Sequence, residues 1–117
     1  MGGDFLDTEK GRKIAEVLKT DSPIYVCPLT FAEISSWANR EEKDPEPFIR
    51  KIKEFSKSLD LDEEILILSG KIHFDQRKNN GKISLIDSVI YTSAAMHGLV
   101  LLTCDSDFAG LAGVNIV

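Results

Sequence analysis

The sequence predicts an α/β protein, a three-layer α/β/α sandwich with a mainly parallel sheet, in a single domain of residues 1–117. Short apolar runs, of the kind found in strands buried on both faces, alternate along the chain with amphipathic segments of helical period. No linker, internal repeat or low-complexity stretch interrupts this alternation. A chain of 117 residues is also long enough to bury the core of one domain.

The strands are predicted from short runs of apolar residues. Residues 24–27 and 99–103 are nearly all apolar, and the second run is the clearest strand in the sequence. Residues 115–117 form a candidate last strand, while residues 59–61 are either a very short strand or a connector.

The helices are predicted from apolar residues at helical spacing and from residues typical of helix ends. Thr30 with Glu33 matches a capping box, and Gly98 suits the left-handed position after a helix. The predicted helices cover residues 8–19, a segment from Thr30, a segment after Asp44-Pro45, a segment from Asp62 to before Asn79, and a segment from Ser84 to Gly98.

The composition excludes several classes of protein. No apolar run reaches the roughly 18 residues of a membrane span, and the N-terminus lacks the features of a secretory signal. Cys27 and Cys104 stand in apolar runs without metal-ligand spacing, so we interpret them as reduced core residues of a cytoplasmic protein. The net charge of −5 argues against a passive nucleic-acid coat protein but is compatible with an acidic metal site.

Acidic residues follow the predicted strands, where α/β proteins bind their ligands. Glu33 comes shortly after the first strand, and Asp105 and Asp107 directly follow residues 99–103. Asp87 stands in the first turn of a helix that should begin at the same edge of the sheet. Carboxylates that converge repel one another, and a divalent cation such as Mg²⁺ or Mn²⁺ relieves the repulsion. These four acids are therefore the candidate metal ligands.

Each acid also has a purely structural interpretation. Glu33 could serve only as the acid of a capping box, and Asp87 could only complement the helix dipole. Asp105 and Asp107 could belong to a simple turn. Trp37 is expected in the core rather than as a platform for base stacking. The basic helix face in residues 10–19 is expected to face solvent, with phosphate contact as the alternative. The joint placement of the acids favours the functional interpretation.

Three segments resemble the acidic motifs of PIN-domain ribonucleases, especially the VapC-type toxins of bacteria and archaea. Residues 28–34 resemble the second motif, residues 84–90 the third and residues 101–108 the fourth, in the family's order and spacing. The resemblance implies a divalent-metal-dependent endoribonuclease that hydrolyses RNA with Mg²⁺ or Mn²⁺. It also implies an antitoxin partner, a homodimer and a cytoplasmic location.

The resemblance assigns roles to the same acids. Glu33, Asp87 and Asp105 would be catalytic and would hold the metal, and Asp107 would assist as a ligand directly or through water. Thr103 or Ser84 would orient the substrate or a ligand.

The N-terminus departs from the family pattern. The family opens with a strand that ends in an L-D-T/S motif, followed by a full helix, and that Asp is a metal ligand. Here Leu6-Asp7-Thr8 has these letters but stands directly against the next predicted helix, so the matching strand is expected upstream of Met1. We therefore expect a sheet that is incomplete at its N-terminal strand, with weaker metal binding. Asp7, or less favourably Asp4, is the alternative first ligand.

Two other functions stay open. A degenerate PIN-like module would bind RNA or an antitoxin without cleavage. A receiver-like signalling domain ranks lower, because the sequence lacks both an acidic pair after a first strand and a lysine after a late strand.

Overall fold

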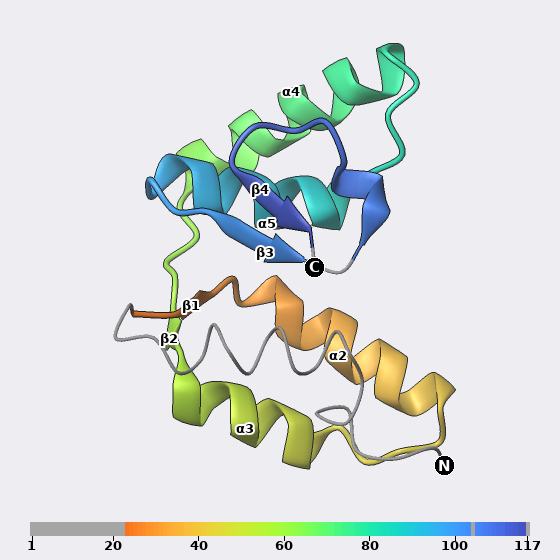
Figure 1. The fold of residues 1–117 in the computed structure, drawn as a ribbon, viewed down its shortest axis with the longest axis vertical. Helices are drawn as coiled ribbons and strands as arrows, with labels where there is room; N and C mark the ends of the chain where they lie inside the picture. Colours follow the sequence, from red (N-terminus) through yellow and green to blue (C-terminus); the bar gives the residue numbers. More distant parts are fainter. Residues whose placement is uncertain (1–22, 104, 117) are drawn as a thin grey trace.

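Helices make up most of the part of the chain that the computed structural model describes, residues 23–103 and 105–116 (Figure 1). The elements in chain order are β1 Tyr25–Val26, α2 Leu29–Arg40, α3 Glu46–Phe55, β2 Lys57–Ser58, α4 Glu63–Lys78, α5 Leu85–Met96, β3 Leu101–Thr103, the short 3₁₀ helix η2 Ser106–Phe108, and β4 Val114–Ile116. Among these, no helix is long and apolar enough to cross a membrane. The predicted helix at residues 8–19 and Cys104 lie outside the described residues.

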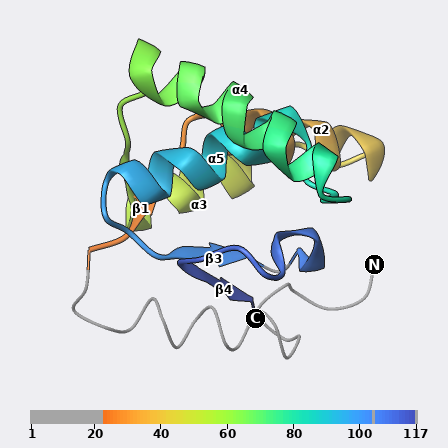
Figure 2. The ribbon, with the colours of Figure 1, turned by 90° about the horizontal axis from the view of Figure 1, so that it is seen from above.

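The strands are parallel, as predicted, but they form two separate pairs. β1 pairs with β2, and β3 pairs with β4. β2 lies two residues before the segment predicted as a strand or connector, and β4 begins one residue earlier than predicted. Figure 2 shows α4 and α5 on the same side of the β3–β4 pair. The α/β class is confirmed, and within the described residues each sheet has two strands.

One edge of each pair has no neighbouring strand among the described residues. The carbonyls of Ile24 and Val26 accept hydrogen bonds of 2.9 Å from the β2 side of the pair, so the backbone groups of Tyr25 face away from β2. Leu101 donates to the carbonyl of Gly113 at 2.9 Å, and by the same alternation Leu102 faces away from β4.

The starts of the helices depend on local hydrogen bonds, of which the sequence predicted the cap at Ser84. The Asp62 side chain caps α4 by accepting from the amide of Ile65 at 2.9 Å. Ser84 opens α5 with a complete capping box. The capping box predicted for Thr30 is wrong, because α2 begins at Leu29 after Pro28 and its N-cap has no side-chain hydrogen bond.

The tightest packing joins α4 to α5. Small residues allow the two helices to approach closely, and the Ser88 hydroxyl donates to the Ser69 carbonyl at 2.8 Å between them. Ile65 and Ile83 are almost fully buried beside this contact. Cys27 is buried as predicted, and this burial raises the pKa of its thiol, which keeps the thiol protonated and unreactive.

Thr92 provides a test of this packing. Its hydroxyl is fully buried and has no hydrogen-bond partner among the described residues, whereas the hydroxyl of Ser88 has one. A buried hydroxyl without a partner loses its hydration and gains nothing in return. Thr92→Val should therefore raise the free energy of unfolding by about 1 kcal/mol, and Ser88→Ala should lower it by about the same amount. Urea denaturation measures both, and a destabilised Thr92→Val variant would contradict this account.

Candidate functional site

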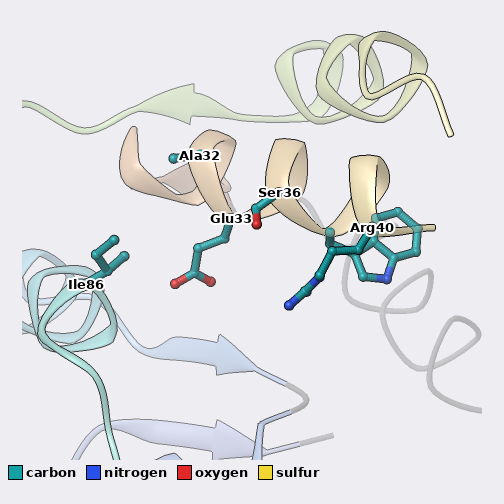
Figure 3. Close-up of a pocket in the computed structure, with 6 residues that line it drawn as sticks. Ala32, Glu33, Ser36, Arg40 and Ile86 are labelled. Atoms are coloured by element: carbon teal, nitrogen blue, oxygen red, sulfur yellow. The ribbon is translucent and has the colours of Figure 1, made fainter. Parts of the chain in front are cut away.

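Glu33 lies on the second turn of α2, with its carboxylate available for a site. Because α2 begins at Leu29 after Pro28, Glu33 does not occupy the capping position that the sequence suggested. Its carboxylate points away from α2, toward the side from which Ile86 of α5 approaches (Figure 3). The structural interpretation of Glu33 as a capping acid is therefore wrong.

Asp87 is held in place by the first turn of α5. Its backbone amide donates to the hydroxyl oxygen of Ser84, with a nitrogen-to-oxygen distance of 3.0 Å. Its carboxylate in turn receives the amide of Ser84 at 3.5 Å, which is a long hydrogen bond. Only one carboxylate oxygen accepts this hydrogen bond. Asp87 therefore has a structural role at the start of α5, and its other carboxylate oxygen can still bind a ligand.

Asp105 and Asp107 lie in the turn after β3. The Asp105 carboxylate caps η2 by accepting from the amide of Asp107 at 2.8 Å. The amide of Asp105 donates to the Thr103 hydroxyl at 3.1 Å, which orients the turn at the end of the strand. Both acids are exposed. The turn interpretation is correct for their backbone and leaves one Asp105 oxygen uncommitted within the described residues.

The acids of α2 and α5 meet. Partial desolvation raises the pKa of Glu33 from 4.5 to about 7, and the other causes are a hydrogen bond to Asp87 and the negative charges of Asp87 and Asp105. Two ionised carboxylates repel each other, so the negative charges of Asp87 and Asp105 favour the protonated form of Glu33. Glu33 as a whole remains exposed to solvent. Glu33, Asp87 and Asp105 thus share one electrostatic site.

A pocket of about 390 Å³ adjoins Glu33 (Figure 3). It is lined by residues of α2 together with one residue of α5: Ala32, Glu33, Ser36, Trp37, Arg40 and Ile86. Glu33 and Arg40 project from the same side of α2 in Figure 3. Trp37 is 37% exposed, so the expectation that it lies in the core is wrong.

The sequence reasoning missed Arg40 and did not assign Trp37 to the site. The signal was present, because residues four and seven positions after Glu33 return to the same face of a helix. A search restricted to acids at strand ends could not find it. The basic residues of the 10–19 segment lie outside the described residues.

The donor set suits a hard divalent cation. Carboxylate oxygens are the ligands that Mg²⁺ and Mn²⁺ prefer, and the raised pKa of Glu33 marks a place where positive charge is favourable. In the residues that the structure describes, no three acids, histidines or cysteines approach closely enough to hold an ion directly. Mg²⁺ often keeps several waters and few direct protein ligands, which fits such a loose arrangement.

The parallel strands, the covering helices and the acids on α2, on α5 and after β3 define an α/β domain with an acidic site. The PIN domain family model matches residues 4–114, and the chain therefore belongs to the PIN domain family. This match confirms the fold class expected from the sequence. PIN domains are generally metal-dependent nucleases.

Comparison with solved structures supports the same fold. A chain of a toxin-antitoxin complex from Klebsiella pneumoniae superposes with a TM-score of 0.66 at 22% sequence identity. The match covers 95% of this chain and 86% of the other chain. No curated protein matches the sequence.

The raised pKa of Glu33 predicts how pH changes stability without metal. Between pH 4.5 and about 7 the folded state holds a proton on Glu33 that the unfolded chain has lost. The free energy of unfolding should therefore fall as pH rises through this window. Urea denaturation at a series of pH values measures this slope.

Glu33→Gln removes the titrating group and should abolish this part of the pH dependence. Glu64→Gln, which removes an exposed carboxylate from α4, is the matched control. Equal slopes for the wild type and Glu33→Gln would contradict the raised pKa.

Proposed function

We propose that this PIN domain is an endoribonuclease that hydrolyses RNA phosphodiester bonds with Mg²⁺ or Mn²⁺. The single observation that carries the proposal is the Glu33 carboxyl group, whose pKa is raised through the nearby Asp87 and Asp105. Acids that repel one another in this way are unfavourable unless a cation or a proton neutralises them. A divalent cation does so and is what the PIN family generally uses.

Each acid has a proposed role. Glu33 and Asp87 would hold the metal between α2 and α5, and Asp105 would hold it from the end of β3. Asp107 would assist directly or through a water molecule. A bound divalent cation supplies a water of lowered pKa as the nucleophile and stabilises the charge that builds up on the phosphate. Glu33 must lose its proton before it can bind metal, so the active form has an ionised Glu33.

A toxin role is part of the proposal. The structurally similar Klebsiella pneumoniae chain comes from a toxin-antitoxin complex, and the family resemblance of the motifs points the same way. We propose that this chain likewise acts with an antitoxin protein, and that it forms a homodimer. The antitoxin would bind the folded domain and block access to the acids.

A second candidate is a PIN-like module that binds RNA or an antitoxin without cleavage. The observation that favours it is the loose spacing of the acids within the described residues. Binding that persists while no metal-dependent cleavage occurs would select this candidate.

Cleavage of single-stranded RNA with added Mn²⁺ or Mg²⁺ tests the leading proposal. We expect cleavage that stops with a chelator and falls by on the order of 100-fold or more in Asp87→Asn, because loss of a supporting residue alone costs a metal site roughly 10- to 100-fold. Gel analysis of end-labelled RNA measures the rates. Asp75→Asn, which changes an exposed aspartate of α4 that pairs with Lys71, is the matched control. Undiminished cleavage by Asp87→Asn would reject the assignment.

Calorimetric titration with Mn²⁺ tests the metal site without RNA. Binding should tighten as pH rises through about 7, because the metal displaces the proton of Glu33. Glu33→Gln should weaken binding and remove this pH dependence, whereas Asp75→Asn should change neither. Binding of the same strength in Glu33→Gln would place the metal elsewhere.

A further inference from the structure

The pocket beside Glu33 contains two side chains that metal binding does not use. Trp37 and Arg40 follow Glu33 by one and two helical turns on the same face of α2, and both line the pocket. Each has an obvious structural role, but neither role accounts for its position in the pocket.

The structural role of Arg40 is to complement the dipole of α2. It is the basic residue in the last turn of this helix, where a cation is favourable. Arg77 likewise lies in the last turn of α4. Among the described residues Arg40 forms no ion pair, although Glu33 lines the same pocket. A guanidinium matches the geometry of a phosphate.

The structural role of Trp37 is to join α2 to α3. Its ring meets Phe48 edge to face at a centroid distance of 5.2 Å, and the Lys43 ammonium lies 5.2 Å from the ring. These contacts hold the indole in one orientation while 37% of the residue stays exposed beside the pocket. A fixed, exposed aromatic ring next to cations is the arrangement on which single-stranded nucleic acids stack their bases.

We propose that Trp37 and Arg40 bind single-stranded RNA, with a base stacked on Trp37 and a neighbouring phosphate on Arg40. The inference rests on the proposed function in that the RNA would continue from these two residues to the acids at Glu33. Along α2, Trp37 lies about 6 Å and Arg40 about 10 Å from Glu33, since each residue advances a helix by 1.5 Å. The acids would then act on the strand that this cationic and aromatic surface positions. Arg40 also offsets the repulsion between the acids and the RNA backbone.

Fluorescence anisotropy with a labelled, unstructured RNA of about ten nucleotides tests the inference. The full chain is titrated in the presence of a chelator, so that metal-dependent cleavage does not consume the probe, and the affinity is measured at several salt concentrations. Arg40→Ala should weaken binding and make the slope of log affinity against log salt less steep by about 0.7, the value for one phosphate contact on a single strand. Arg40→Lys should keep the wild-type slope. Arg77→Ala is the matched control, because it removes the same charge from the last turn of another helix.

Trp37→Ala should weaken binding by about 5- to 150-fold, as loss of one stacked base does, and should leave the salt slope unchanged. Trp37→Phe should restore most of the affinity and also guards against a folding defect, which circular dichroism would detect. Phe55→Ala is the matched control, because Phe55 is an exposed aromatic residue of α3 with Lys51 5.6 Å from its ring, outside this pocket.

The outcomes separate this inference from the proposed function. RNA binding that depends on Trp37 and Arg40, without any cleavage by the metal-loaded wild type, would support the site and reject the nuclease. Cleavage by the wild type, with Arg40→Ala and Trp37→Ala binding RNA as the two controls do, would support the nuclease and overturn the site. No measurable binding by the wild type at low salt would also overturn the site. The site would likewise be overturned if Arg40→Ala and Trp37→Ala impaired the binding of a protein partner but not the binding of RNA.

Discussion

The contact between α2 and α5 brings two carboxyl groups together, and the chemistry of the domain depends on this unfavourable approach. Glu33 and Asp87 can share a proton or a cation, but two bare charges at this distance would repel. Both residues lie near the N-terminal ends of their helices, where the dipoles partly offset the negative charge. The fold therefore tolerates the pair without neutralising it completely, and it leaves a place at which positive charge stabilises the protein.

The helices rather than the strands hold this arrangement. The strands contain only two or three residues each and form two separate pairs among the described residues. Pairs this short have little stability of their own. The α4–α5 contact, with its buried serines and Ile65, supplies the rigid packing from which Asp87 is presented.

The site joins an acidic half to a cationic and aromatic half along one face of α2. Glu33 belongs to the acidic half, whereas Trp37 and Arg40 belong to the other. A nuclease needs both, because acids that hold a metal also repel the phosphate backbone of the substrate. The net charge of −5 makes a local cation more valuable than it would be on a basic protein. The periodicity of one helix is sufficient to place both halves within reach of one strand of RNA.

The sequence alone determined the α/β class, the parallel pairing, the capping of α5, and the three acidic segments, because these depend on local patterns of apolar, capping and turn residues. The capping box that it suggested for Thr30 and Glu33 and the core position that it predicted for Trp37 are wrong. Residue types that favour helix caps do not reveal where a helix begins when proline precedes it. The helical periodicity of apolar residues does not reveal which face of the helix a neighbouring element covers. Only the tertiary structure decided that Glu33 meets Asp87, that the strands form two pairs, and that Arg40 lines the pocket. These features depend on how α2 packs against α5, and contacts between residues so distant in sequence leave no periodic signal along the chain.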